Sequence, residues 1–72
     1  MQVYEFRQDV DRWILLDGKA QKYLAQQLGV SQPYLNLIIN GKKLCSKVFA
    51  YALTKCVSNT KTIEDLFVRK EK

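Results

Sequence analysis

The sequence predicts an all-α protein, a compact bundle of about five short helices in a single domain. Three observations lead to this prediction. Apolar residues recur every three or four positions along most of the chain, which is the period of a helix with one buried face. Gly and Ser interrupt these stripes at short intervals and so predict turns between the helices. The length of 72 residues leaves room for one small core.

The first helix is expected from about Tyr4 to Leu16. Four apolar residues follow one another at helical intervals and would form its buried face: Phe6, Val10, Trp13 and Leu16. Asp17-Gly18 comes next, and glycine readily takes the left-handed conformation that ends many helices. The helix should therefore stop at this pair.

Two short helices joined by a tight turn are expected next. The earlier one runs from about Ala20 to Leu28 and ends at Gly29. In the later one, Ser31 can accept a backbone N–H bond as a cap, and Pro33 is tolerated in the first turn because no N–H is needed there. Asn40-Gly41 closes this helix. The shared core of the pair would consist of Leu24, Leu28, Val30, Leu35 and Ile38, and Ala25 must be small because the second helix crosses over it.

Two further helices complete the predicted bundle. One runs from about Ser46 to Val57, and the next opens at Thr62, where Asp65 three positions later forms a variant of the capping box. The last helix would bury Leu66 and Phe67. The single domain then covers residues 1–68, and the charged tail 69–72 is expected to fray.

Several classes of protein are excluded by what the chain lacks. It has no His, the side chain used most often as a general base near neutral pH, so we do not expect an enzyme. Its two cysteines, Cys45 and Cys56, are too few for the usual zinc spacings and are expected as reduced thiols in or near the core. No metal, cofactor or small-molecule ligand is expected. The longest apolar run, Val48 to Leu53, is too short for a membrane span or a signal peptide, which predicts a soluble intracellular protein.

Positive charge is concentrated in the middle of the chain. The formal net charge is +5, and acids and bases cancel within residues 1–30 and again within residues 62–72. The segment between residues 31 and 61 contains no acid, and the whole excess comes from Lys42, Lys43, Lys47, Lys55 and Lys61. Such a local field favours a polyanion such as nucleic acid. On charge alone, a lysine-rich face that serves only solubility is the alternative.

The segment from Gln21 to Gln32, with its small Ala25 and the turn Leu28-Gly29-Val30-Ser31, resembles the helix-turn-helix of the phage Cro and repressor family, the XRE-type domain. The resemblance continues through Asn40-Gly41-Lys42 and more loosely to Leu66-Phe67, about 50 residues in all. It implies a lambda repressor-like fold with the motif at about residues 21–40. It also implies that the second helix of the motif enters the major groove of double-stranded DNA.

The resemblance also implies roles for individual side chains. Gln32 corresponds to a groove-reading glutamine, whose amide can engage adenine N6 and N7 together. Gln21 corresponds to a glutamine that contacts phosphate and braces its partner helix, and Asn40 to a residue that contacts the DNA backbone. Surface glutamines chosen for helix propensity, and a plain helix stop at Asn40-Gly41, are the alternatives. The implied DNA-binding residues are Gln21, Ser31, Gln32, Pro33, Tyr34, Asn36, Leu37, Asn40, Lys42 and Lys43.

The chain departs from the family pattern at two places. Ala20 stands where the family usually has a Thr or Ser cap. Pro33, Tyr34 and Leu37 stand where many relatives have polar base readers, so direct hydrogen bonding to bases should be sparse. Leu37 can instead contact thymine methyl groups or another protein. A protein interface on this helix would use Tyr34, Leu37 and Ile39, and simple variation at half-buried positions is the remaining alternative.

These observations leave two functions open. The first is a Cro-like transcriptional regulator of the phage lysis–lysogeny switch that binds an operator, as a homodimer or in concert with a repressor. The second is a modulator of repression, or antirepressor, that keeps the fold but acts by binding a phage repressor protein, with weak or no DNA binding. Both would act in the cytoplasm of a bacterial host cell.

Overall fold

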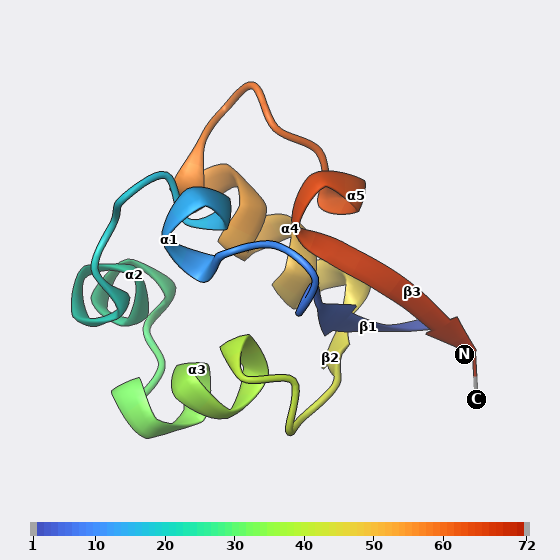
Figure 1. The fold of residues 1–72 in the computed structure, drawn as a ribbon. Helices are drawn as coiled ribbons and strands as arrows, with labels where there is room; N and C mark the ends of the chain where they lie inside the picture. Colours follow the sequence, from blue (N-terminus) through green and yellow to red (C-terminus); the bar gives the residue numbers. More distant parts are fainter. Residues whose placement is uncertain (1, 72) are drawn as a thin grey trace.

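The protein combines helices with a three-stranded antiparallel sheet in a computed structural model that describes residues 2–71, except for the side chain of Glu71. Figure 1 shows α2 and α3 at one end of the molecule, with the strands and both described chain ends at the other. The elements, in chain order, are β1 (Gln2–Phe6), α1 (Arg12–Leu15), α2 (Gln21–Leu28), α3 (Gln32–Ile39), β2 (Cys45–Ser46), α4 (Lys47–Val57), α5 (Ile63–Leu66) and β3 (Phe67–Glu71).

The prediction of an all-α bundle is wrong, because the start of the chain is a strand rather than a helix. β1 is the central strand in the order β2-β1-β3. It pairs antiparallel with β2, with Tyr4 opposite Cys45, and with β3, with Phe6 opposite Phe67. The side chains of Tyr4 and Phe6 are buried at an interval of two, which is the period of a strand. β1 has five residues, too few for a clear alternation of buried and exposed side chains. The apolar residues that continue at helical spacing to Leu16 therefore favoured a helix.

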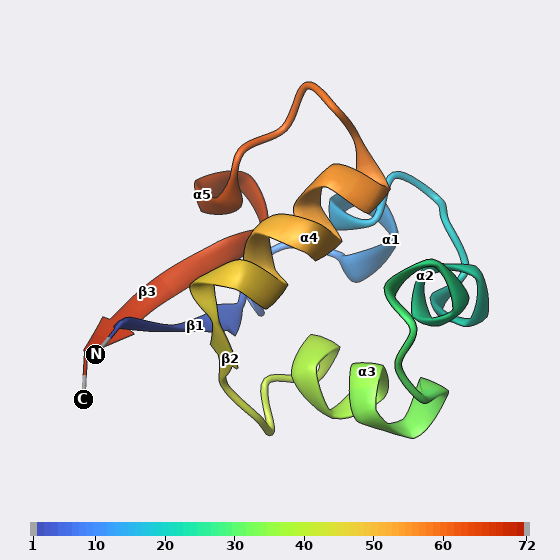
Figure 2. The same cartoon turned by 180° about the vertical axis from the view of Figure 1, so that it is seen from behind.

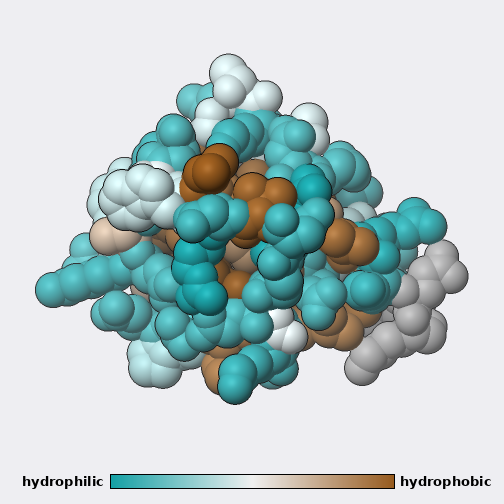
Figure 3. Space-filling model, in the orientation of Figure 1, coloured by the Kyte–Doolittle hydropathy of each residue, from teal (hydrophilic) through white to brown (hydrophobic). Residues whose placement is uncertain are grey.

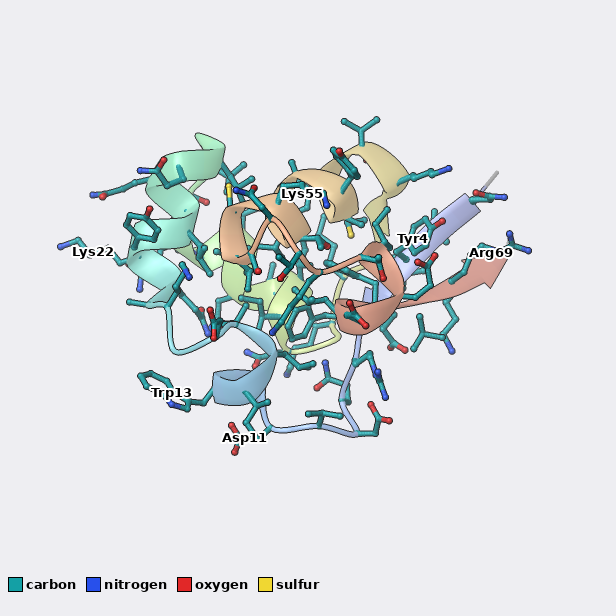
Figure 4. All side chains as sticks on the ribbon, turned by 90° about the horizontal axis from the view of Figure 1, so that it is seen from above. Tyr4, Asp11, Trp13, Lys22, Lys55 and Arg69 are labelled. Atoms are coloured by element: carbon teal, nitrogen blue, oxygen red, sulfur yellow. The ribbon has the colours of Figure 1, made fainter. Side chains whose placement is uncertain are left out.

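The predicted first helix is reduced to the single turn of α1. Asp11 caps it by accepting a 2.7 Å hydrogen bond from the backbone N–H of Trp13. Trp13 was expected in the core, but 67% of its surface is exposed, and it projects from α1 away from the body of the molecule (Figure 4). The core is reached instead by Leu15 and Leu16, which are buried.

The next three helices lie close to their predicted bounds, and the caps explain why. Ser31 accepts a 3.2 Å hydrogen bond from the N–H of Tyr34 at the start of α3. Ser46 caps α4 in the same way, through the N–H of Phe49. Ala20 gives α2 no side-chain cap, yet α2 still begins directly after it. Serine caps are read from short sequence patterns, which is why these helices were predictable.

The expected frayed tail is also corrected by the structure. Asp65 accepts hydrogen bonds from the backbone N–H and the hydroxyl of Thr62, which opens α5 as predicted. The helix ends after one turn, however, and Phe67 begins β3 rather than completing α5. Arg69 and Lys70 pair with β1, opposite Tyr4 and Val3. Figure 4 shows Tyr4 and Arg69 side by side on the neighbouring strands. Lys72 lies outside the described residues.

One continuous core lies between the sheet and the helices. α4 contacts α2, α5, β1 and β2, and Figure 2 shows it running from the strands towards α2. Both cysteines are free, and burial raises the pKa of the Cys45 thiol to about 11, so it stays protonated at neutral pH. Within residues 2–71, no helix has the length and apolar character needed to cross a membrane. The buried apolar side chains are Tyr4, Phe6, Leu15, Leu16, Leu24, Ala25, Leu35, Ile38, Ile39, Cys45, Ala50, Leu53, Val57, Ile63, Leu66 and Phe67.

Candidate nucleic-acid interface

α2 and α3 form a tightly joined helix pair. The left-handed φ of 72° at Gly29 turns the chain, and the N–H of Val30 bonds to the carbonyl of Ala25 at 3.1 Å. Glycine tolerates this backbone conformation without the steric cost that other residues have. Leu24 and Leu35 are fully buried between the two helices and the rest of the core. The inner side of α3 is therefore fixed, which leaves its opposite side facing solvent.

Four side chains share the exposed side of α3, which we call the outer face of α3. They are Gln32, Pro33, Asn36 and Leu37. The same four residues line a shallow depression in the surface. Leu37 is 43% exposed, a large fraction for a leucine, and the Gln32 amide has no hydrogen-bond partner within the described part of the chain. The outer face thus presents one free amide beside apolar surface.

Tyr34 does not belong to the outer face of α3, although the sequence analysis predicts it in the same binding surface as Leu37. It is half-buried, and its ring meets the ring of Phe49 edge to face at a centroid distance of 5.8 Å. The Lys43 Nζ lies over the ring of Tyr34, 5.8 Å from the ring centroid. Tyr34 therefore joins α3 to α4 and holds a lysine beside the end of α3.

Ile39 does not belong to an exposed interface. Only 1% of its surface is exposed, and it lies in the core on the side of α3 that contacts β1. The prediction of a protein interface at Ile39 is therefore wrong. The sequence suggested an unusually apolar α3, but the sheet that covers Ile39 was not predicted, so its side chain had no apparent partner.

Three amides form a hydrogen-bonded chain along α3. The Asn40 Nδ2 donates to the Asn36 Oδ1 at 2.9 Å, and the Asn36 Nδ2 donates to the Gln21 Oε1 at 3.1 Å. This chain links the end of α3, its middle turn and the first residue of α2. Because the Gln21 Oε1 accepts from Asn36, the orientation of the Gln21 amide is fixed. The Gln21 Nε2 has no hydrogen-bond partner within residues 2–71 and can donate to another molecule.

The amide chain leads to a prediction about stability. Gln21→Ala and Asn36→Ala each remove the same hydrogen bond, so their effects on the free energy of unfolding should be non-additive by about 0.5–1 kcal/mol. Urea unfolding of both single variants and the double variant measures this coupling. The control pair Gln21→Ala and Gln32→Ala shares no hydrogen bond and should be additive. Additivity in the first pair would contradict the contact.

The lysines between residues 31 and 61 differ in whether their charge is free to contact another molecule. Lys42 and Lys43 are exposed directly after α3, and Lys47 is exposed at the start of α4. The Lys55 Nζ instead donates to the carbonyls of Asn59 and Lys61, at 3.3 and 3.1 Å, and so closes the loop after α4. The positive charge available beside α3 therefore comes from Lys42, Lys43 and Lys47.

Gln8 holds the end of α3 in place, a role that no sequence pattern predicts. Its Nε2 donates to the carbonyls of Phe6 and Ile39, at 2.8 and 2.9 Å. Gly41, with a φ of 75°, leaves space for it, since a Cβ there would lie 3.1 Å from the Gln8 amide. Gln8 thus ties β1 to α3 across 31 positions of sequence, and no local pattern signals such a contact.

A second depression lies between β1 and α1, away from the outer face of α3. Arg7 donates to both carboxylate oxygens of Asp9, at 3.1 and 2.9 Å. The hydrogen bond and the opposite charge raise the pKa of Arg7, and the hydrogen bond to Arg7 lowers the pKa of Asp9. The two charges cancel, so this depression is not an attractive site for an anion.

The positive, partly apolar end of the molecule formed by α2, α3 and the following loop is chemically suited to a polyanion. Side-chain amides and lysines supply donors, and no acid lies between residues 31 and 61 to oppose them. Most of the surface seen in Figure 3 is hydrophilic, with hydrophobic side chains confined to small patches. Comparisons of the chain with protein-family models, with curated proteins and with solved structures found no match.

Proposed function

We propose that the chain binds double-stranded DNA with α3 in the major groove and acts as a Cro-like transcriptional regulator. The observation that carries this proposal is the outer face of α3, where the free Gln32 amide stands beside exposed apolar surface. Exposed lysines follow directly at positions 42 and 43. An α-helix fits the major groove, where a glutamine amide can bond to adenine and apolar groups can contact thymine methyls.

Contacts to the DNA backbone would position α3. The Gln21 amide nitrogen is oriented by Asn36 and can donate to a phosphate oxygen beside the groove. Lys42 and Lys43 would neutralise phosphates next to the end of α3. The chain would bind an operator as a homodimer or together with a repressor, in a phage genetic switch within a bacterial cell.

The double variant Lys42→Ala, Lys43→Ala tests the backbone contacts. It should weaken binding to every duplex alike and reduce the slope of log affinity against log salt by about two, because two phosphates are no longer neutralised. Fluorescence anisotropy on labelled duplexes across a salt series measures this slope.

The matched control is Lys61→Ala with Lys70→Ala, which removes the same charge at positions outside the α2–α3 pair. Lys61 approaches the carbonyl of Ile14, and Lys70 pairs with Glu5. This control should leave the salt slope near that of the wild type. Loss of affinity for one particular sequence only, with an unchanged slope, would show that Lys42 and Lys43 do not contact phosphate. Absence of any duplex binding by the wild type would overturn the proposed function itself.

A modulator of repression that binds a phage repressor is the second candidate, and the exposure of Leu37 favours it. A leucine that is 43% exposed in an apolar depression is also typical of a protein interface. Here the outer face of α3 would contact the repressor instead of DNA. The variant Leu37→Asp separates the two candidates.

A further inference from the structure

We propose that the solvent-facing side of α4 is a second binding surface, which takes an acidic, amphipathic peptide segment of another protein. We call this surface the exposed face of α4, and it consists of Lys47, Val48, Tyr51 and Lys55. The inference goes beyond the proposed function, because it concerns another helix and does not require DNA binding. Figure 2 shows α4 across the near side of the molecule, with α3 along the lower edge.

Two apolar side chains stand uncovered at the centre of the exposed face of α4. Val48 is 80% exposed and Tyr51 is 56% exposed. Residues three positions apart are neighbours on a helix, so the two side chains offer one joint apolar surface. The opposite side of α4 is already packed in the core through Ala50, Leu53 and Val57. Only another molecule can therefore remove Val48 and Tyr51 from water.

Lysines flank this apolar pair along the helix axis. Lys47 and Lys55 are eight positions apart, which corresponds to about 12 Å along an α-helix. Lys47 is exposed and has no carboxylate partner within residues 2–71. The whole segment 31–61 contains no acid that could oppose the two charges. A partner with carboxylates on both sides of an apolar residue would complement this face in charge and in polarity.

The Lys55 ammonium is held in place before a partner binds. Its Nζ donates to the carbonyls of Asn59 and Lys61 and lies over the Tyr51 ring, 5.5 Å from the centroid. An ammonium group has three N–H donors, so one is left for a carboxylate. Because this long side chain is already ordered, an ion pair with it costs less conformational entropy than one with a mobile lysine.

The apolar pair favours a protein segment over duplex DNA as the occupant. The backbone of DNA offers phosphates and sugars, which would satisfy the lysines but leave Val48 and Tyr51 against a charged surface. An amphipathic helix that carries carboxylates beside its apolar residues satisfies both kinds of side chain. We therefore assign an acidic peptide, rather than a polyanion without apolar groups, to the exposed face of α4.

A second copy of this chain does not have the required chemistry. A two-fold contact between two copies of α4 would bring lysines of one copy near lysines of the other. Acids elsewhere in the chain are already engaged, since Glu5 pairs with Lys70 and Asp9 with Arg7. The carboxylates must therefore come from a different protein.

Fluorescence anisotropy with labelled synthetic peptides tests the inference on the full chain. The probe is a peptide of about fifteen residues, enough for about four helical turns, in which Leu and Phe recur every three or four positions among Asp and Glu. One companion peptide replaces Leu and Phe with Ser, and another replaces Asp and Glu with Asn and Gln. We expect each companion to bind about tenfold more weakly than the probe, because each lacks one of the two matching features.

Variants assign the binding to the exposed face of α4. Tyr51→Ala should weaken probe binding about tenfold, whereas Tyr51→Phe keeps the ring and should retain most of the affinity. Lys47→Glu should weaken binding and reduce its dependence on salt. Ile14→Ala is the apolar control, because Ile14 is also exposed but lies on α1. Lys22→Glu is the charge control, since it makes the same change in the first turn of α2. Both controls should bind the probe like the wild type.

Each result decides between distinct conclusions. Equal binding of the peptide without Leu and Phe would reduce the contact to charge alone and overturn the inference. Failure of the probe to bind, or full affinity in a folded Tyr51→Ala variant, would overturn it as well. Loss of binding to a random-sequence duplex in Tyr51→Ala would identify nucleic acid as the occupant instead. A chain that binds the probe through Tyr51 but binds no duplex would keep this inference and lose only the proposed DNA binding.

Discussion

Replacing Phe6 with alanine is expected to lower the free energy of unfolding by about 3–5 kcal/mol, a large part of the total stability of a small domain. Phe6 is fully buried in the central strand. Its ring meets the ring of Phe67 edge to face, with 5.3 Å between the centroids. Truncation would leave a cavity where β1 and β3 meet the helices, and it would remove the aromatic contact between the two strands.

Trp13→Ala is the matched control for Phe6→Ala, because both change an aromatic residue that the sequence placed on the same buried helix face. Trp13 is 67% exposed, so this change should cost only about 0.5 kcal/mol. Urea unfolding followed by far-UV circular dichroism measures both values without using the tryptophan itself as a probe. An equal cost for the two substitutions would contradict the strand at Gln2–Phe6 and support a helix there.

If the chain binds DNA as proposed, Leu37→Asp should produce the largest change in binding, a loss of about a hundredfold or more in affinity for duplex DNA. The new carboxylate would stand among the phosphates of the groove, and the apolar contact would be lost. Because Leu37 is 43% exposed and outside the buried core, helical content and melting temperature should remain close to the wild type. Anisotropy measurements and thermal melts on the same preparation test both statements.

The same variant separates the two proposed functions. If the outer face of α3 binds DNA, Leu37→Asp should lose duplex binding and keep any complex with a phage repressor. If the outer face binds the repressor, that complex should be lost, since an unpaired carboxylate would be buried in the interface. Leu37→Asn controls for the charge. A variant that keeps both activities would leave the outer face without a binding role, and one that unfolds would place Leu37 in the core.

The helices of this protein were predictable because their signals are local. Ser31, Gly29 and Ser46 act within a few positions of themselves, and the structure places a cap or a turn at each. The strands were not predictable in the same way. β1 and β3 have five residues each, and they pair with each other although they lie at opposite ends of the sequence. Neither segment alone is long enough to show a clear alternation of buried and exposed residues.

The residues of the candidate site also differ in whether local sequence patterns are enough to place them. Gln32 with Asn36, and Pro33 with Leu37, are each four positions apart, so each pair can be placed on one side of α3 from the helical period alone. The burial of Ile39 depends on β1, and the packing of Tyr34 depends on Phe49, so both required the tertiary structure. The hydrogen bond from Asn36 to Gln21 likewise could not be predicted from the sequence, because it joins side chains on two different helices.

The antiparallel pairing of β1 with β3 also governs when the domain can fold during its synthesis. β1 is synthesised first, and β3 follows roughly sixty residues later. β1 therefore cannot pair with β3, the strand that lies along its full length, until synthesis of the domain is almost finished. The helices can form on the growing chain, but Phe6 stays uncovered until Phe67 has left the exit tunnel. Completion of the sheet is therefore expected to be a late, cooperative step that closes a long loop, and a nascent chain without β3 should expose the core to chaperones and proteases.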